Sequence, residues 1–263
     1  MRITQTTLRK MHQNGEKIAA LTCYDAIFAT LLENAGVEIL LVGDSLGNVL
    51  QGEATTLAVT LDDMIYHTRC VAKGSSKAFI MVDMPFGTFQ VTPEKTFENA
   101  ARLMAAGAHM VKIEGGQVMA DTIRFLTQRG IPVCAHIGLT PQSIHQLGGY
   151  KIQGNNEETA RQLLDDAVIL EKSGAAMLLM EVVPAKLATT ITQTLSIPTI
   201  GIGAGKNCSA QVLVLHDMLG IYHDKKARFV KDFMAGKNSI QEAVASYVAA
   251  VKTGEFPGKE HEF

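Results

Sequence analysis

The chain has 263 residues, of which 47% are hydrophobic and 19% charged, and its formal net charge is −2. This composition excludes a disordered chain and is typical of a globular protein with enough apolar material for a large core. The nearly balanced charge and the lack of a Lys/Arg cluster argue against nucleic-acid binding, so small molecules or copies of the chain itself are the expected partners.

Short apolar runs alternate with amphipathic stretches of helical length, which indicates repeated strand–helix units on a parallel sheet. Eight such units are what a closed (β/α)8 TIM barrel requires, although an open doubly wound sheet would give nearly the same pattern. We favour the barrel, as one domain over residues 1–263. The expected strands are 17–25, 38–45, 78–85, 109–116, 131–138, 175–183, 197–205 and 211–219.

Helix boundaries are marked by their usual residues. Thr60, Thr92 and Thr140 are each followed by first-turn chemistry and are expected N-caps. Glycines close the helical patterns of 33–36, 104–107, 127–130 and 171–174, where a left-handed cap is expected. A long helical segment at about 226–252 follows the eighth strand, and the glycine-rich connection 141–158 is expected to be a mobile loop over a site.

Cysteine usage and hydropathy bear on the compartment. The four cysteines are scattered without a Cys-x-x-Cys pair, which suggests neither a disulfide framework nor a zinc site. The start, "MRITQTTLRKMHQNGEK", has no apolar segment of signal-peptide length, and no later stretch approaches the roughly 20 apolar residues that span a bilayer. We therefore expect a cytoplasmic protein with no membrane partner.

Polar side chains recur where the expected strands end. In a parallel barrel these carboxyl ends meet at one face, so residues far apart in sequence converge there. Side chains alternate along a strand, so Lys112 and Glu114 share one face while Val111 and Ile113 take the other. The strand-end residues are Tyr24, Asp25, Asp44, Ser45, Asp83, Lys112, Glu114, His136, Glu181, His216 and Asp217.

Asp44, Asp83 and Glu114 come from three successive expected strands. Hard oxygen ligands without cysteine or a paired-histidine motif favour Mg²⁺ or a similar ion, which keeps open positions for water or a chelating substrate. Lys112 could neutralise substrate charge. The set indicates electrophilic activation of an anionic, oxygen-rich substrate by a bound metal.

Each of these residues also has a purely structural explanation. Asp44, Ser45 or Asp83 could be turn or N-cap residues, and Lys112 with Glu114 could be a structural ion pair. His136 could be a hydrogen-bonded core histidine, and the glycines of "GIGAG" (201–205) could serve a tight turn instead of a phosphate. Glu181 is harder to explain structurally, because an unpaired carboxylate within "LLMEVVP" is energetically unfavourable.

Nine segments, read together, resemble the ketopantoate hydroxymethyltransferase family almost end to end. The resemblance implies a barrel related to the phosphoenolpyruvate mutase and isocitrate lyase group, a homodecamer and a requirement for Mg²⁺. "PFGTFQV" (85–91) and "IYHDKKARF" (221–229) depart from the family pattern, which leaves loop geometry and folate contacts open. The matching segments are "TCYD" (22–25), "LLVGDSLG" (40–47), "IYHT" (65–68), "FENAARLMAAGAHMVKIEGG" (97–116), "PVCAHIGLTPQS" (132–143), "GGYKIQG" (148–154), "IPTIGIGAG" (197–205), "HDMLG" (216–220) and "FPGKEHEF" (256–263).

The implied activity is transfer of a hydroxymethyl group from 5,10-methylenetetrahydrofolate to 3-methyl-2-oxobutanoate through a Mg-stabilised enolate. The product, ketopantoate, leads to pantothenate and coenzyme A. Position by position, the family's metal ligands fall on Asp44, Asp83 and Glu114, and its ketoacid contacts on Asp44, Ser45, Asp83 and Lys112. Its proposed general base falls on Glu181, and His136 falls at a site-lining position.

Two other functions fit the same residues. A Mg²⁺-dependent 2-oxo acid lyase or aldolase of the same superfamily would use these carboxylates to cleave a C–C bond, and it would turn over without folate. The other is a barrel kept only for ligand binding or assembly, which failure to bind both Mg²⁺ and ketoacid would support. The presence of all three metal carboxylates together with Glu181 speaks against it.

Overall fold

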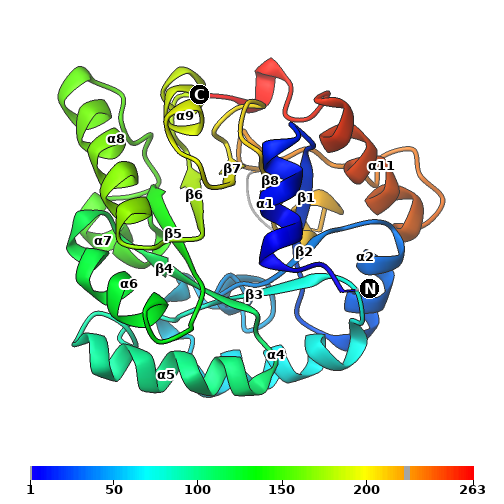
Figure 1. Cartoon of the computed structure of the whole chain (residues 1–263). Helices are drawn as coiled ribbons and strands as arrows, with labels where there is room; N and C mark the ends of the chain where they lie inside the picture. Colours follow the sequence, from blue (N-terminus) through cyan, green and yellow to red (C-terminus); the bar gives the residue numbers. More distant parts are fainter. Residues whose placement is uncertain (1, 222–225) are drawn as a thin grey trace.

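The computed structural model of the chain describes residues 2–221 and 226–263. Eight parallel strands form a closed barrel in which each strand pairs with the next and β8 pairs with β1 (Figure 1). The expected barrel is thereby confirmed over the open sheet. The strands are β1 (Ile18–Thr22), β2 (Ile39–Val42), β3 (Phe79–Asp83), β4 (Met110–Glu114), β5 (Val133–Gly138), β6 (Met177–Glu181), β7 (Thr199–Ile202) and β8 (Ala210–Leu213).

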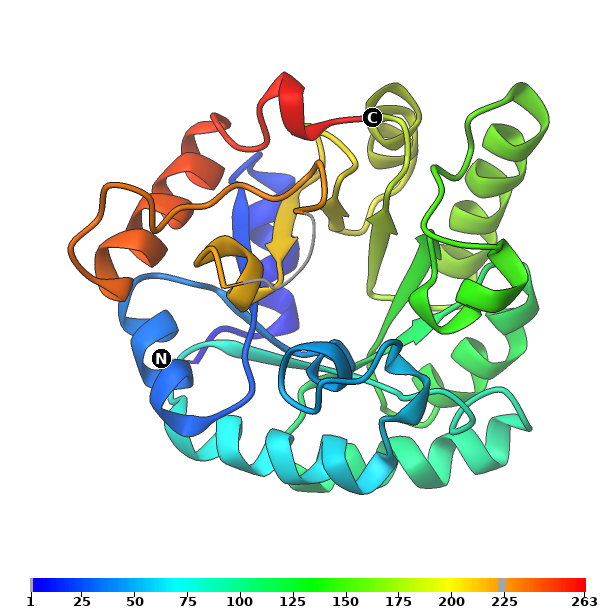
Figure 2. The same ribbon diagram turned by 180° about the vertical axis from the view of Figure 1, so that it is seen from behind.

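Helices surround the barrel, and α4 and α5 run side by side along its outside near β3 (Figures 1 and 2). Within the described residues, no helix is both long enough and apolar enough to cross a bilayer. The α-helices are α1 (Gln5–Gln13), α2 (Ala26–Asn34), α3 (Leu46–Val49), α4 (Leu61–Gly74), α5 (Pro93–Ala106), α6 (Ala120–Thr127), α7 (Ile144–Leu147), α8 (Glu157–Lys172), α9 (Ala185–Thr194), α10 (Leu215–Met218) and α11 (Ile240–Thr253). Single 3₁₀ turns are η1 (Thr56–Ala58), η2 (Gln117–Met119), η3 (Pro141–Ser143) and η4 (Lys259–His261).

Most expected helix boundaries are confirmed by their caps. The side chains of Thr60 and Thr92 accept hydrogen bonds from the third helical N–H of α4 and α5, which satisfies a donor left free at each helix start. The four expected glycines all have positive φ, as at Gly107 (φ +120°), where a β-carbon would lie 2.5 Å from Ala72 Cβ. Thr140 makes no cap hydrogen bond, and only η3 and the four-residue α7 follow it.

Three expectations near the C-terminal part are wrong. The eighth strand ends at Leu213, so that the later residues of the expected strand lie on α10. The seventh strand ends at Ile202, so residues 203–205 of the expected strand belong to the loop that joins β7 to β8. The last long helix begins at Ile240, because Ser239 caps it and Gly236 has φ +73°, which a right-handed helix does not contain.

The strands divide their side chains between two apolar clusters. Val82, Val111 and Ile113 face outward into the core that the strands share with the helices. Met81, Met110, Cys134 and Leu179 face the barrel interior, where Leu8 of α1 joins them. The alternation expected from the sequence therefore holds, and it points Asp83, Lys112 and Glu114 into the barrel. Helix α1 lies across the amino-terminal end, opposite the loops that carry the polar residues (Figures 1 and 2).

Candidate active site

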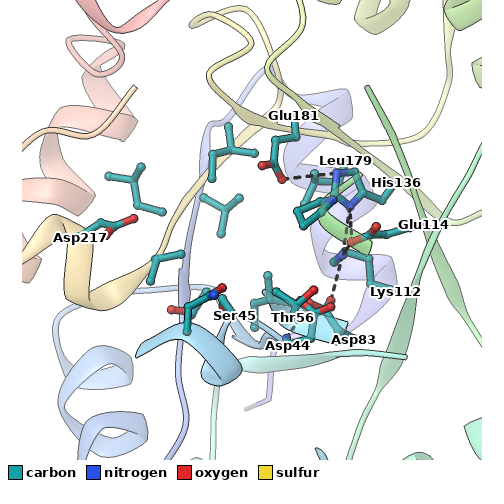
Figure 3. Close-up of a pocket in the computed structure, with 18 of the residues that line it drawn as sticks. Asp44, Ser45, Thr56, Asp83, Lys112, Glu114, His136, Leu179, Glu181 and Asp217 are labelled. Carbon is teal, nitrogen blue, oxygen red and sulfur yellow. Dashed lines mark hydrogen bonds and ion pairs between the residues drawn. The ribbon is translucent and has the colours of Figure 1, made fainter. Parts of the chain in front are cut away.

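A cavity of about 180 Å³ lies at the carboxyl ends of the strands. Every residue that the sequence assigned to the site lines it, so the structure brings the expected set together (Figure 3). These residues are Asp44, Ser45, Asp83, Lys112, Glu114, His136 and Glu181. Further lining comes from Thr22, Leu41, Asn48, Thr56, Pro141, Tyr150, Leu179, Ile202, Val212, Leu213, Val214, Asp217 and Phe229.

Lys112 is the buried cation of the cavity and contacts two carboxylates. Its Nζ lies 3.2 Å from Asp83 Oδ1 and 3.8 Å from Glu114 Oε1, and all three side chains are about 95% buried. Burial raises the pKa of both carboxyl groups, and the lysine charge opposes that rise. Burial also acts to lower the pKa of Lys112, but the nearby carboxylates of Asp83, Glu114 and Asp44 raise it above its ordinary value. Lys112 is therefore held as an ammonium.

Asp44 begins the turn after β2 and is held from two sides. Its backbone N–H donates to Asp83 Oδ2 at 3.0 Å, which joins the ends of β2 and β3. Its Oδ2 accepts a hydrogen bond from Gln142 Nε2 at 2.8 Å. Asp44 thus makes no helix cap, although it does lie in the turn after β2, and its side chain also lines the cavity.

Ser45 occupies the N-cap position of α3 without making a side-chain cap bond. Its Oγ instead lies 2.9 Å from Tyr24 Oη, in a hydrogen bond that joins the ends of β1 and β2. Burial raises the pKa of Tyr24, which therefore stays a neutral phenol. The pair presents two hydroxyl groups beside Asp44.

His136 lies between Lys112 and Glu181. Burial, followed by the charge of Lys112, lowers the pKa of the imidazole well below its ordinary value, so the ring is neutral. Its Nδ1 lies 3.1 Å from Lys112 Nζ and must accept there, because an ammonium can only donate. The ring proton therefore sits on Nε2, which faces Glu181 Oε2 at 3.5 Å (Figure 3).

Glu181 ends β6 and faces the cavity. Burial raises its pKa to about 8, with Lys112 opposing the rise. The residue after it, Val182, has φ +50°, an unusual conformation for a β-branched residue. Its neighbour on β5, Gly138, has φ +91°, and a β-carbon there would lie 2.4 Å from the carbonyl oxygen of Glu181. Backbone geometry on both sides therefore fixes where this carboxyl group stands.

Other strand-end residues from the sequence have different places. Asp25 caps α2 by accepting a hydrogen bond from Phe28 N, so its role is structural. His216 packs against Tyr24 with ring centroids 5.8 Å apart. Asp217 lines the cavity across from Lys112 and His136, and burial raises its pKa to about 6 (Figure 3).

Gln142 is the site residue that the sequence did not reveal. Its side chain is buried and bridges Asp44 Oδ2 and the carbonyl oxygen of Met84, while its backbone N–H donates to Glu114 Oε2. Gln142 lies in the segment "PVCAHIGLTPQS", which resembles the family, but a glutamine in a turn does not by itself indicate a functional residue. The 141–158 connection does reach the cavity, through Pro141 and Tyr150.

The hydrogen bonding of the acidic residues indicates whether they could bind a cation. Asp83 Oδ1 and Glu114 Oε1 are fully buried, and apart from their ion pairs with Lys112 no described residue donates a hydrogen bond to either. In the described residues, no three His, Cys, Asp or Glu side chains are placed so that they alone could hold an ion. Mg²⁺ usually takes only one or two carboxylates and completes its shell with water and substrate oxygens, so the donors present fit this ion.

Solved structures of known proteins share the fold. Phosphonopyruvate hydrolase, in a complex with oxalate and Mg²⁺, gives a TM-score of 0.64 at 13% identity over 97% of this chain and 99% of its own. The lyase for 2,3-dimethylmalate, described as a member of the PEP mutase/isocitrate lyase superfamily, gives 0.59 at 17% identity over 84% and 81% of the two chains. The chain is therefore a (β/α)8 barrel with a polar cavity at its strand ends, and these solved structures share its fold.

Sequence comparison then gives the family. The family described as ketopantoate hydroxymethyltransferase matches residues 2–259. The 3-methyl-2-oxobutanoate hydroxymethyltransferase of Nitrosospira multiformis is 74% identical over the full length of both chains, and that of Nitrosomonas eutropha is 69% identical over 100% of this chain and 97% of its own. The chain belongs to the ketopantoate hydroxymethyltransferase family, which confirms the resemblance seen in its motifs and the hydroxymethyltransferase activity expected from it.

Proposed function

We propose that this chain transfers a hydroxymethyl group from 5,10-methylenetetrahydrofolate to 3-methyl-2-oxobutanoate, with Mg²⁺ held among Asp44, Asp83 and Glu114 together with water and substrate oxygens. One observation carries the proposal. The buried carboxyl groups of Asp44, Asp83 and Glu114 share the single ammonium of Lys112, and its ion pairs are the partners that the described residues offer Asp83 Oδ1 and Glu114 Oε1. Three buried carboxylates need more positive charge than one ammonium supplies, which favours a bound cation beside them.

The ketoacid is expected to lie on the floor of this cavity, next to Asp44, Ser45, Asp83 and Lys112. When bound, Mg²⁺ supplies a Lewis acid that draws electron density from the keto and carboxylate oxygens of the substrate. Lys112 stays protonated and compensates the negative charge that the ketoacid brings and that develops during the reaction. The hydroxyl group of Ser45 lines the cavity, is held by Tyr24 Oη and offers a hydrogen bond at the same level.

Glu181 takes the proton from C3 of the ketoacid in this proposal. A carboxyl group with a pKa near 8 holds a proton well and yet releases it near neutral pH, which suits a general base and acid. The C3–H bond breaks toward Glu181, and its electron pair forms the new bond to the one-carbon unit of the folate. Hydrolysis of the donor consumes one water, frees tetrahydrofolate and leaves the hydroxyl group on ketopantoate.

The decisive experiment is an assay of ketopantoate formation from 3-methyl-2-oxobutanoate and methylenetetrahydrofolate, with and without a chelator. We expect formation that stops with chelator and returns with added Mg²⁺. Cleavage of a 2-oxo acid at a comparable rate without folate would favour the lyase or aldolase alternative. Formation of ketopantoate that is insensitive to chelator would remove the metal from the proposal.

The ligand assignment has its own test. Asp83→Ala should abolish Mg²⁺-dependent binding of the ketoacid in calorimetry, because it removes an oxygen of the proposed metal site. Asp121→Ala is a matched control, since that carboxylate is exposed on α6, away from the cavity, and forms an ion pair with Arg124. Unchanged ketoacid affinity in Asp83→Ala would refute the assignment.

The family resemblance also implies a homodecamer, and the sequence pattern led us to expect a cytoplasmic location and a single domain over residues 1–263. We propose each of these for the chain. Size-exclusion chromatography with light scattering tests the decamer. A mass of one or two chains at micromolar concentration would contradict it.

A further inference from the structure

Gln142 contacts the ends of three strands at once, although it belongs to none of them. Its Nε2 donates to Asp44 Oδ2 at 2.8 Å and to the carbonyl oxygen of Met84 at 2.9 Å. Its backbone N–H donates to Glu114 Oε2 at 3.0 Å. With 5% of its surface exposed, the residue is buried, so these bonds form where water does not replace them.

The orientation of this amide is fixed by its neighbours. Both partners of Nε2 are pure acceptors, and Gln142 Oε1 accepts from Gln90 Nε2 at 3.4 Å. Rotating the amide by half a turn would set its oxygen against the Asp44 carboxylate and the Met84 carbonyl. The residue can therefore act only as a donor toward Asp44.

These bonds decide which oxygen of each carboxylate remains available. Asp44 uses Oδ2 for Gln142, and Glu114 uses Oε2, so Glu114 Oε1 is left buried without a hydrogen bond from any described residue. A carboxylate with one oxygen engaged has one fixed direction in which its other oxygen can bind a cation. Partners of this kind orient metal ligands and tune their affinity.

We propose that Gln142 is the positioning residue for Mg²⁺ binding, an inference that rests on the proposed metal site. Through the same contacts, Gln142 couples the 141–158 connection to the ion. The same turn is also tied to the base, because Leu139 N donates to the carbonyl oxygen of Glu181 at 2.8 Å. Cation binding tightens the carboxylates against Gln142 and so stabilises the connection that forms part of the cavity wall. Order in the connection stabilises the metal site in return, since such coupling is reciprocal.

The test measures binding of Mg²⁺ alone by calorimetry, without substrates. Gln142→Leu keeps the side-chain volume and the backbone N–H to Glu114 but removes the donor to Asp44. We expect its Mg²⁺ affinity to fall about 10- to 100-fold. Gln142→Asn retains the amide chemistry on a side chain too short to reach Asp44 and should fall similarly. Gln153→Leu is the control, because Gln153 lies in the same connection and its side chain donates only to the Lys151 carbonyl.

Hydrogen exchange supplies a readout that a loss of stability alone would not produce. Mg²⁺ should slow amide exchange over residues 141–158 in the wild type and in Gln153→Leu, and it should do so much less in Gln142→Leu at matched metal occupancy. Wild-type Mg²⁺ affinity in both Gln142 variants would overturn the inference and leave the proposed function intact. A wild-type chain that binds no Mg²⁺ would overturn the metal site itself and the inference with it.

Discussion

His136 Nε2 lies 3.5 Å from Glu181 Oε2, and Lys112 on the other side of the ring makes Nε2 the protonated nitrogen. The carboxylate of Glu181, which we propose as the base, therefore faces the N–H group of His136 and not the lone pair of an unprotonated ring nitrogen. A donor at this distance steers the carboxylate without forming a full hydrogen bond, and Glu181 remains free to take a proton from the substrate.

Glu181→Gln should bind the ketoacid with Mg²⁺ but lose exchange of the C3 hydrogen in deuterated water. The amide fits the space of the carboxyl group and cannot accept the proton. Nuclear magnetic resonance of the ketoacid without folate measures this step alone, and a loss of about 100-fold or more is expected for a missing general base. Asp217→Asn changes a carboxylate across the same cavity and should exchange at the wild-type rate. Normal exchange in Glu181→Gln would remove the residue as the base.

The same substitution should change the dependence of stability on pH. The pKa of Glu181 is raised from 4.5 to about 8 in the native state, so between these values the folded chain holds a proton that the unfolded chain releases. Stability from this group is complete below pH 4.5 and falls as the pH rises toward 8. Glu181→Gln removes that loss, so its advantage in thermal midpoint over the wild type should grow from pH 5 to pH 8 when both are measured in chelator. A constant difference between the two pH values would contradict the raised pKa.

Lys112→Met should destabilise the fold strongly. It leaves Asp83 and Glu114 buried without their cation, and breaking a buried charge pair from one side typically lowers the free energy of unfolding by about 3–5 kcal/mol. Lys95→Met removes the exposed pair with Glu98 and should change stability by less than about 1 kcal/mol. Urea unfolding measures both. If the metal site is assigned correctly, Mg²⁺ should also stabilise Lys112→Met more than the wild type, because the ion then supplies the missing charge.

Val182→Gly should be less destabilising than Val183→Gly, although both remove a buried valine side chain. Val182 has φ +50°, a conformation that costs a β-branched residue about 1–3 kcal/mol and that glycine adopts freely. Relief of that strain offsets part of the lost burial at position 182 and not at position 183. Urea unfolding of the two variants gives the comparison. Equal losses of stability would show that the backbone at Val182 stores no strain.

Val182→Gly should also lower kcat while leaving KM for the ketoacid unchanged. Glycine frees the backbone directly after Glu181, so the base is less well oriented, whereas the residues on the floor of the cavity keep their contacts. Steady-state kinetics over a range of ketoacid concentrations separates the two constants. A raised KM with normal kcat would indicate that the position serves substrate binding instead.

Those parts of the fold that follow local rules were predictable from sequence. The apolar runs gave the eight strands, and the alternation along β4 placed Lys112 and Glu114 on one face because side chains in a strand have a period of two. The convergence of Asp44, Asp83 and Glu114 followed from parallel topology, which brings all strand ends to one face.

The helix expected at 226–252 shows where local rules fail. The first part of this stretch, up to Ser239, is irregular, and from it Phe233 packs edge-on against Tyr247 and Phe256. The burial of Phe233 comes from tertiary contacts and not from a helical face. Residues 222–225, directly before this stretch, lie outside the described residues.

Gln142 could not have been found by position or pattern. Its function depends on a turn after β5 that folds back over the ends of β2, β3 and β4, and no spacing in the sequence encodes that path. Which nitrogen of His136 carries the proton likewise depends on the three-dimensional structure, because β4 places the Lys112 ammonium 3.1 Å from Nδ1.

The position of helix α1 bears on the order in which substrates bind and products leave. Leu8 packs into the barrel interior at its amino-terminal end, and the cavity lies among the loops at the other end, so we expect both substrates to enter from that end. In our proposal the small ketoacid lies deepest in the cavity. It must therefore bind before the much bulkier folate, which would block its access. We therefore expect an ordered sequence in which tetrahydrofolate departs first and ketopantoate last. Ketopantoate should then inhibit competitively against the ketoacid in product-inhibition kinetics, whereas tetrahydrofolate should not. The opposite pattern would rule out this order of binding and release.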